Sequence, residues 1–354
     1  MQRPSPLGDS ALAANISSQS CCTLVAAGTL FPLLDLPGAA VERVLGSVSG
    51  REDRHALRLA FKRGRAAVDR GVVAVKRDDQ VLSQAQLSAL VGAPWRLQRL
   101  ELRGCQVGAE GAAALAAAAW PGLVRLDLRN NQLGDPGAAA LAAADWPCLE
   151  TIDLGNTGLG PPGAAAAWPR LKALTINHNR LGDQGAAALA AGTWPALETL
   201  QLGNSESVAA LAAGTWPCLK SLLLGINAIG AAGAAALAAA TWSSLQTLSL
   251  GCNDLGTAGA AALAAGRNWL SLSTLLLAGN GLGAAGAAEL AAANFPNLWW
   301  LDVTRNNLGD NGSMVAMNCP DLAVLHLQYN NISTEGAAAL AAAASGRPRL
   351  HLYL

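Results

Sequence analysis

Arginine, aspartate, leucine and tryptophan side chains recur at alternate positions of short strand-like segments, where they could bind a protein partner. Alternate side chains of a strand point to opposite faces, so the residues between the repeated leucines share one face. Exposed arginine and tryptophan are the residue types that most often anchor protein interfaces. We therefore expect a contact face with a charged part and a more apolar part, and the alternative is a solvated face without a partner. The charged residues are Arg103, Arg125, Asp127 and Arg129, and the later residues are Leu223, Leu276, Trp300, Asp302 and His326.

No spacing in the sequence is typical of a catalytic or metal site. The four histidines, His55, His178, His326 and His351, lie far apart. The chain has no HExxH, phosphate-binding P-loop, nucleophile-elbow or paired-cysteine motif. We expect a protein that is not an enzyme, with no catalytic residue, no metal and no cofactor.

One glycine pattern imitates a cofactor-binding turn. Gly281, Gly283 and Gly286 match the G-x-G-x-x-G spacing of a dinucleotide-binding loop between a strand and a helix. The corresponding repeats place Gln132 or Arg180 at the first of these glycines. That glycine is therefore incidental to the turn, and the pattern indicates repeat architecture.

The strand-like segments belong to a repeat of about 26 residues. A strand, a turn and a short alanine-rich helix of this length cannot enclose a core alone, so the units must stack. Neighbouring strands lie ~4.8 Å apart and helices ~10 Å apart, so the stack bends with its strands inside. We predict an α/β leucine-rich-repeat solenoid over residues 97–354, a horseshoe of about ten units with parallel strands and outer helices. The opening leucines are Leu97, Leu123, Leu149, Leu171, Leu197, Leu219, Leu245, Leu272, Leu298 and Leu322.

Two further positions of the repeat have predictable roles. A polar residue, most often asparagine, follows each strand and should bond to the backbone of adjacent coils in a ladder. A tryptophan, often followed by proline, should fill core volume and end the helix. The units opening at Leu149 and Leu197 are only 22 residues long, and we expect shortened helices there.

The composition favours a neutral protein of a reducing compartment. Lysine and arginine number 24, as do aspartate and glutamate, and the seven cysteines show no CxxC spacing. Alanine-rich runs are interrupted too often to span a membrane. We expect a cytoplasmic or nuclear protein that does not contact a membrane and is monomeric on its own. Residues 1–30 are predicted to be a disordered leader, with a targeting peptide as the alternative.

A helical module is predicted over residues 31–77, followed by a capping half-repeat over residues 78–96. Apolar residues at Val41, Val44, Leu45 and Val48 have helical spacing. Residues 51–77 carry nine basic and three acidic side chains. Such a patch can meet an acidic protein surface or phosphate, but it has no aromatic interleaving, so nucleic-acid binding is disfavoured.

Residues 34–70 resemble the F-box, a module that docks on the adaptor subunit of cullin-RING ubiquitin ligases. The Leu-Pro pair, the helix after it and the later Leu-Arg and Phe-Lys pairs fall on the pattern, while Gly64 occupies the position of its usual tryptophan. A helical cap over the end of the solenoid is the alternative for this module. The resemblance implies adaptor contacts by Leu36, Pro37, Val44, Leu45, Leu57, Arg58, Phe61 and Lys62.

Together the two parts favour a protein-interaction receptor, the substrate-recognition subunit of a cullin-RING ligase. The repeats resemble ribonuclease-inhibitor-like repeats, and their Gly-Ala-Leu-Ala helices are similar to those found behind an F-box in some proteins. One alternative is a binding scaffold unrelated to ubiquitin. Another is a leucine-rich-repeat activator of a small GTPase, which would need an exposed arginine such as Arg180.

Overall fold

The computed structural model describes residues 23–26, 29–31, 73–79, 81–91, 97–165, 168, 170–205, 209–266, 268–310 and 319–354. The chain forms two compact units, residues 1–158 and residues 159–354. The eight predicted adaptor-contact residues of the F-box-like module lie outside the described residues.

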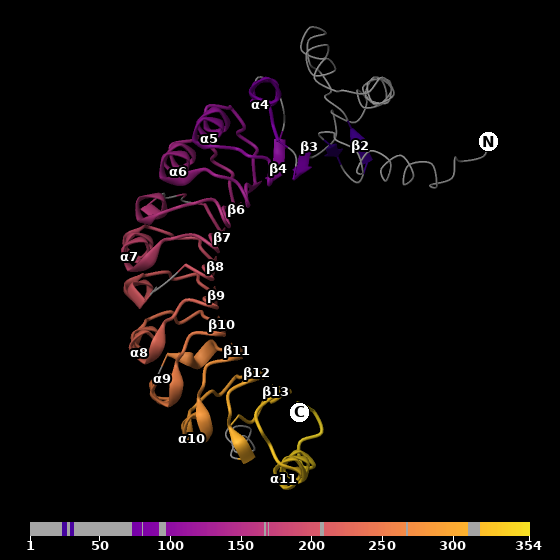
Figure 1. Cartoon of the computed structure of the whole chain (residues 1–354), viewed down its shortest axis with the longest axis vertical. Helices are drawn as coiled ribbons and strands as arrows, with labels where there is room; N and C mark the ends of the chain where they lie inside the picture. Colours follow the sequence, from indigo (N-terminus) through magenta and orange to yellow (C-terminus); the bar gives the residue numbers. More distant parts are fainter. Residues whose placement is uncertain are drawn as a thin grey trace, which may run out of the picture. The chain divides into compact units, whose positions relative to one another are not determined.

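Unit 1 is a sheet with helices on one side. Its strands β3 to β6 are parallel, whereas β1 pairs antiparallel with both β2 and β3. Figure 1 shows α5 and α6 on the outer side of the strands that precede them in the chain. The strands are β1 (Thr23–Ala26), β2 (Thr29–Phe31), β3 (Val73–Asp78), β4 (Leu97–Arg103), β5 (Arg125–Asp127) and β6 (Thr151–Asp153), and the helices are α4 (Gln84–Val91), α5 (Ala109–Ala116) and α6 (Gly134–Ala142).

Strand β3 differs from the prediction, because the sequence pattern places its residues at the end of the helical module. Val75 and Arg77 are 2% and 7% exposed, and the residues between and beside them are more exposed. This alternation is that of a strand, and pairing with β4 stabilises it. Residues 73–78 thus form a strand that pairs with the first predicted strand of the array. Strands β1 and β2 likewise occupy residues assigned to the leader and to the start of the module.

Unit 2 is a stack of parallel strands that pair in chain order. Its strands are β7 (Ala173–Thr175), β8 (Thr199–Gln201), β9 (Ser221–Leu223), β10 (Thr247–Ser249), β11 (Thr274–Leu276), β12 (Trp300–Asp302), β13 (Val324–His326) and β14 (His351–Tyr353). Its α-helices are α7 (Gly182–Ala191), α8 (Gly230–Ala239), α9 (Gly256–Ala264), α10 (Gly283–Ala292) and α11 (Thr334–Ala344).

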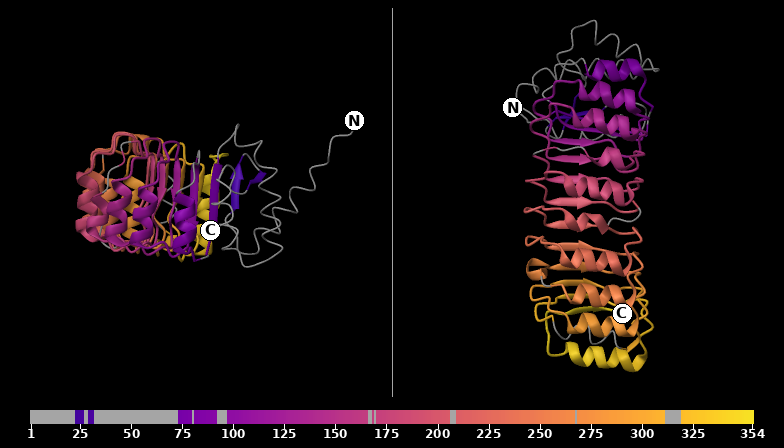
Figure 2. Two further views of the ribbon diagram at one scale, coloured as in Figure 1. Left: turned by 90° about the horizontal axis from the view of Figure 1, so that it is seen from above. Right: turned by 90° about the vertical axis from the view of Figure 1, so that its left-hand side faces the viewer.

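Within unit 2 the strands line the inner side of a curve and the helices its outer side (Figure 1). The right-hand view of Figure 2 shows these helices side by side in one layer. Alanine and glycine let neighbouring helices pack closely: a Cβ on Gly286 would lie 3.2 Å from the Cβ of Ala260. The curvature agrees with the different widths of strands and helices.

The two 22-residue repeats, which open at Leu149 and Leu197, contain 3-10 helices in place of α-helices, as their length predicts. These are η2 (Pro161–Ala165) and η3 (Ala209–Ala213), and a third, η4, spans Trp269–Ser271. Their tighter winding closes the coil with fewer residues.

Columns of leucine form the core, as predicted from the alternation. Leu100, Leu126 and Leu248 are 0% exposed. The tryptophans at the helix ends are also buried, and Trp216 stacks on Trp242 with ring centroids 5.6 Å apart. The predicted roles of both positions are confirmed.

The polar ladder is confirmed by its hydrogen bonds. The Asn280 side chain donates to the carbonyls of Leu250 and Leu277, and its oxygen accepts the backbone N–H of Asn253 at 2.8 Å. One asparagine thus joins two coils of the stack. All ten positions are buried: Cys105, Asn131, Thr157, Asn179, Ser205, Asn227, Asn253, Asn280, Asn306 and Asn330.

Candidate protein-binding face

In both units the strand side chains that point away from the leucines form a partly exposed face. In β6 to β11 and in β13 the middle residue of the strand is buried and its two neighbours are half-buried. We call this the strand face. Its composition differs sharply between the two units.

The strand face of unit 1 is charged and is arranged in rows that cross the strands. Arg99 lies beside Arg125 in one row. Glu101, Asp127 and Asp153 form the next row, since Asp127 pairs in register with the other two. Arg103, the last residue of β4, and Arg129, two residues after the end of β5, flank the acidic row on its other side.

Asp127 holds the second pair of arginines. Its Oδ2 accepts hydrogen bonds from Arg103 Nε and from a terminal nitrogen of Arg129, both at 2.8 Å. Its Oδ1 accepts from Arg129 Nε at 3.1 Å and from the backbone N–H of Arg129 at 3.3 Å. The sequence predicted that Asp127 would contact a partner, but the residue is 0% exposed. The two guanidinium groups cover it, so its role is to position them.

Burial and these hydrogen bonds act in opposite directions on the Asp127 carboxyl. Burial acts to raise its pKa, but the hydrogen bonds and charges of Arg129 and Arg103 outweigh burial, so the pKa lies below its ordinary value. In the neighbouring Asp153 burial dominates and raises the pKa, although the side chain accepts the N–H of Gly155 at 3.0 Å. Arg129 Nε lies 3.3 Å from Asp153 Oδ2. The closest contacts between opposite charges on this face are therefore those of Asp127 and Asp153 with Arg103 and Arg129.

The strand face of unit 2 ends in an aromatic ladder made of Trp300, His326 and Tyr353 from β12, β13 and β14. The rings of Trp300 and His326 are stacked with centroids 5.5 Å apart, and those of His326 and Tyr353 with centroids 4.3 Å apart. Trp300 is 36% exposed and Tyr353 is 45% exposed. Apolar ring area on a strand face is a typical anchoring surface for a protein partner.

A polar network supports the ladder. His326 Nδ1 lies 3.3 Å from the side-chain oxygen of Gln328, which also accepts a hydrogen bond from Thr304 at 3.3 Å. Because an amide oxygen only accepts, a hydrogen bond at this contact requires the tautomer with the proton on His326 Nδ1. Asp302 pairs in register with His326 and accepts the N–H of Thr304 at 2.9 Å.

The structure brings most of the later predicted residues together but leaves one apart. Leu276 is in register with Asp302 on the next strand, so both border the ladder. Leu223 lies two strands further away, separated from Leu276 by Ser249 of β10. Leu223 therefore faces a part of the surface with small polar neighbours.

Sequence reasoning missed two aromatic residues near the ladder. Tyr353 pairs in register with His326, and Trp299, 49% exposed, contacts Trp300 with ring centroids 6.1 Å apart. The alternation of Leu350, Leu352 and Leu354 around Tyr353 could have revealed the first. Trp299 lies before the first residue of β12, so the alternation of strand side chains does not predict its position.

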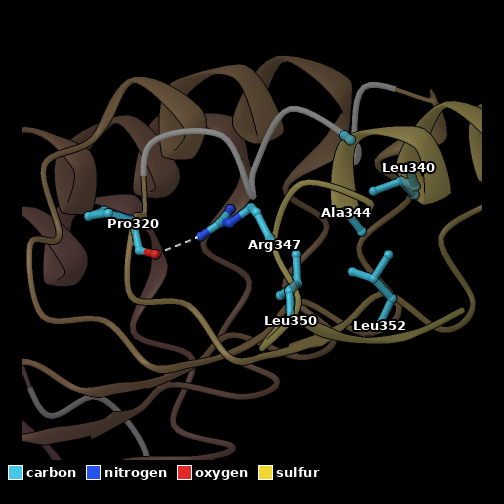
Figure 3. A pocket seen from close by; sticks show the side chains of 7 residues that line it. Pro320, Leu340, Ala344, Arg347, Leu350 and Leu352 are labelled. Atoms are coloured by element: carbon cyan, nitrogen blue, oxygen red, sulfur yellow. Dashed lines mark hydrogen bonds between the residues drawn. The ribbon is translucent and has the colours of Figure 1, made fainter.

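The described part of the chain offers little that resembles a catalytic pocket. A small pocket beside α11 is lined by apolar side chains and Arg347, whose guanidinium donates to the carbonyls of Cys319 and Pro320 (Figure 3). The described residues contain no group of three or more His, Cys, Asp or Glu side chains placed to hold a metal ion. None of the described helices is both long enough and apolar enough to cross a bilayer. Arg180 is exposed in the turn after β7, where its N–H donates to Leu159.

Comparison with known proteins agrees with this architecture. A leucine-rich-repeat family profile matches residues 97–116, 123–142, 170–190, 243–264 and 318–341. A search of curated proteins finds no match. Among solved structures, a chain from the crystal structure of the yeast Rad7 and Elc1 complex has a TM-score of 0.53 and 18% identity, covering 99% of this chain and 87% of that one. The fold class is the predicted α/β leucine-rich-repeat solenoid.

Proposed function

We propose that this chain is a receptor that binds a protein partner on its strand face. The observation that carries the proposal is the aromatic ladder, because Trp300 and Tyr353 expose ring area on a face built by repeats. Leucine-rich repeats are typical protein-interaction scaffolds, and their inner strand face is the usual contact surface. Leu276 and Asp302 border the ladder and would add apolar and polar contacts at its edge.

We further propose that the F-box-like segment, residues 34–70, attaches the receptor to the adaptor subunit of a cullin-RING ubiquitin ligase. The support is the resemblance of this segment. The yeast chain of similar fold is crystallised as a complex of Rad7 with Elc1, so that protein too assembles with a second chain. In this proposal the strand face selects the substrate and the segment delivers it.

Affinity capture with quantitative mass spectrometry tests the receptor. The bait is the full chain, compared with the double variant Trp300→Ala and Tyr353→Ala. Glu289→Ala is the control, because Glu289 is exposed on the outer helix α10. We expect proteins held by the native chain and by Glu289→Ala to be lost by the double variant, and each candidate is then confirmed as a purified pair. If every captured protein persists on the double variant, the ladder is not the binding surface.

Direct binding of a purified adaptor subunit tests the ligase link. We expect the native chain to bind it and a double variant of the segment, Leu36→Ala and Leu45→Asp, to lose binding while keeping the circular dichroism of the repeats. Absence of adaptor binding by the native chain, with partner capture intact, would leave a scaffold unrelated to ubiquitin.

A further inference from the structure

Arg99 and Arg125 form a pair of like charges on the strand face of unit 1. They are in register on the parallel strands β4 and β5, and adjacent strands lie only ~4.8 Å apart. Like charges directly opposite each other destabilise a sheet. Such a pair is favourable where a counter-charge is available.

The chain itself supplies little counter-charge to this pair. Among the described residues, the ion pair of Arg125 is with Glu101, whose Oε1 lies 3.8 Å from Arg125 Nε. That nitrogen is buried and has no hydrogen-bond partner. Glu101 also pairs with Arg103 at the shorter distance of 3.1 Å. Arg99 is exposed and makes no ion pair within the described residues.

The second pair of arginines on this face is already satisfied. Arg103 and Arg129 are fixed on the buried Asp127 by hydrogen bonds of 2.8 Å. Exposure does not separate the two pairs, since the side chains of Arg129 and Arg125 are 39% and 40% exposed. The two pairs differ in their contacts within the described residues: Arg103 and Arg129 are hydrogen-bonded to Asp127, whereas the contact of the other pair is the 3.8 Å ion pair of Arg125 with Glu101.

We propose that Arg99 and Arg125 bind a carboxylate side chain from an acidic segment of the protein partner. The guanidinium fork matches a carboxylate with two parallel hydrogen bonds, and 40% of the Arg125 side chain is exposed to such a partner. This inference deepens the proposed receptor function and rests on it. The strand face of unit 1 would then bind an acidic side chain, whereas the aromatic ladder offers apolar ring area.

The charge of the whole face favours an acidic protein segment over nucleic acid. Lys76 and Asp78 of β3 continue the rows, so the face carries five basic and four acidic side chains: Lys76, Arg99, Arg103, Arg125 and Arg129 against Asp78, Glu101, Asp127 and Asp153. One added carboxylate neutralises the single net charge. A polyphosphate backbone that contacted both arginine rows would have to cross the acidic row between them, which would repel it.

Fluorescence anisotropy with the full chain and a labelled peptide of alternating glutamate and glycine tests the proposal. We expect binding that weakens with salt and falls about tenfold in Arg99→Gln and in Arg125→Gln. Arg125→Lys should also weaken binding, since a lysine keeps the charge but loses the fork. The matched control is Arg170→Gln, an exposed arginine outside the strands of unit 2, which should bind as the native chain does.

The outcomes separate this proposal from the receptor function. Equal loss in Arg170→Gln, or no binding of the peptide, overturns the proposal, and the Trp300 and Tyr353 experiment still decides the receptor. Tighter binding of a single-stranded oligonucleotide than of the peptide, with the same dependence on Arg99 and Arg125, overturns it in favour of nucleic acid. Circular dichroism of each variant shows whether the repeats are folded.

Discussion

The Asn253 side-chain oxygen accepts the backbone N–H of Asn227 at 2.8 Å, which joins two consecutive coils through one buried amide. The same side chain donates to the Leu224 carbonyl at 2.8 Å. Each coil of unit 2 therefore depends on the polar residue of the next. Stability in such a stack comes largely from the contacts between neighbours.

Replacing Asn253 with alanine should strongly destabilise the repeats. The substitution leaves the buried N–H groups of Asn227 and Ile229 without their acceptor, and each unsatisfied group costs ~1–3 kcal/mol. We expect a loss of about 3 kcal/mol in urea unfolding. Asn297→Ala is the control, because the hydrogen bond of Asn297 to Leu270 is exposed. Equal midpoints for the two variants would contradict the ladder's role.

The buried Asp127 should make unit 1 sensitive to acid. Because its pKa is lowered in the folded protein, the carboxylate stabilises the fold above the ordinary aspartate value of about 3.9, and this stabilisation is lost as pH falls through the lowered pKa. Asp127→Asn should cost about 2 kcal/mol at neutral pH, since its arginine partners are partly exposed. Its stability should then fall less steeply on acidification than that of the native chain.

Asp153 provides the comparison of opposite sign. Its pKa is raised, so its contribution is present at low pH and is lost as pH rises through the raised value. Asp153→Asn should therefore be more stable than the native chain at neutral pH, and this difference in stability should disappear in acid. Urea unfolding at a series of pH values measures both variants, and parallel pH profiles for them would refute the assignment.

The repeat architecture could be predicted from the sequence because its signals are local. The alternating leucines, the polar residue after the strand and the tryptophan that follows most helices all lie within one repeat. The burial of Asp127 could not be predicted in this way. Alternation places it on the strand face beside Arg125 and Arg129, and only the side-chain geometry shows that Arg103 and Arg129 close over it.

Strand β3 could not be predicted for a related reason. Strand β3 has no leucine motif, and its inward side chains are Val75 and Arg77. Because one of these two is charged, the sequence shows no clear alternation of apolar and polar residues, and the strand becomes evident from its pairing with β4. The aromatic ladder was found in part, through Trp300 and His326. Its third ring, Tyr353, becomes evident from the register of β14 with β13.

Ile226 is a position where a substitution should stabilise the protein. Its φ is +60°, a left-handed conformation that a β-branched residue adopts at a cost of roughly 1–2 kcal/mol, and asparagine occupies the equivalent turns at Asn130 and Asn204. The side chain is 58% exposed, so little packing is lost. Ile226→Asn should raise stability by about 1 kcal/mol in urea unfolding. Leu270→Asn, an exposed leucine without this backbone conformation, should change it by less than about 0.5 kcal/mol.

A single added methyl group at Gly214 should disrupt the tryptophan stack. A Cβ at this position would lie 2.6 Å from the Trp216 ring, which is itself packed against Trp242 at 5.6 Å. Neither ring can move without opening the core, so Gly214→Ala should cost ~1–3 kcal/mol, as overpacking does elsewhere. Gly346→Ala is the matched control, because a Cβ there meets no atom within 4 Å among the described residues. Near-ultraviolet circular dichroism should show the change in the tryptophan environment, and native spectra and stability for Gly214→Ala would mean that the stack yields without cost.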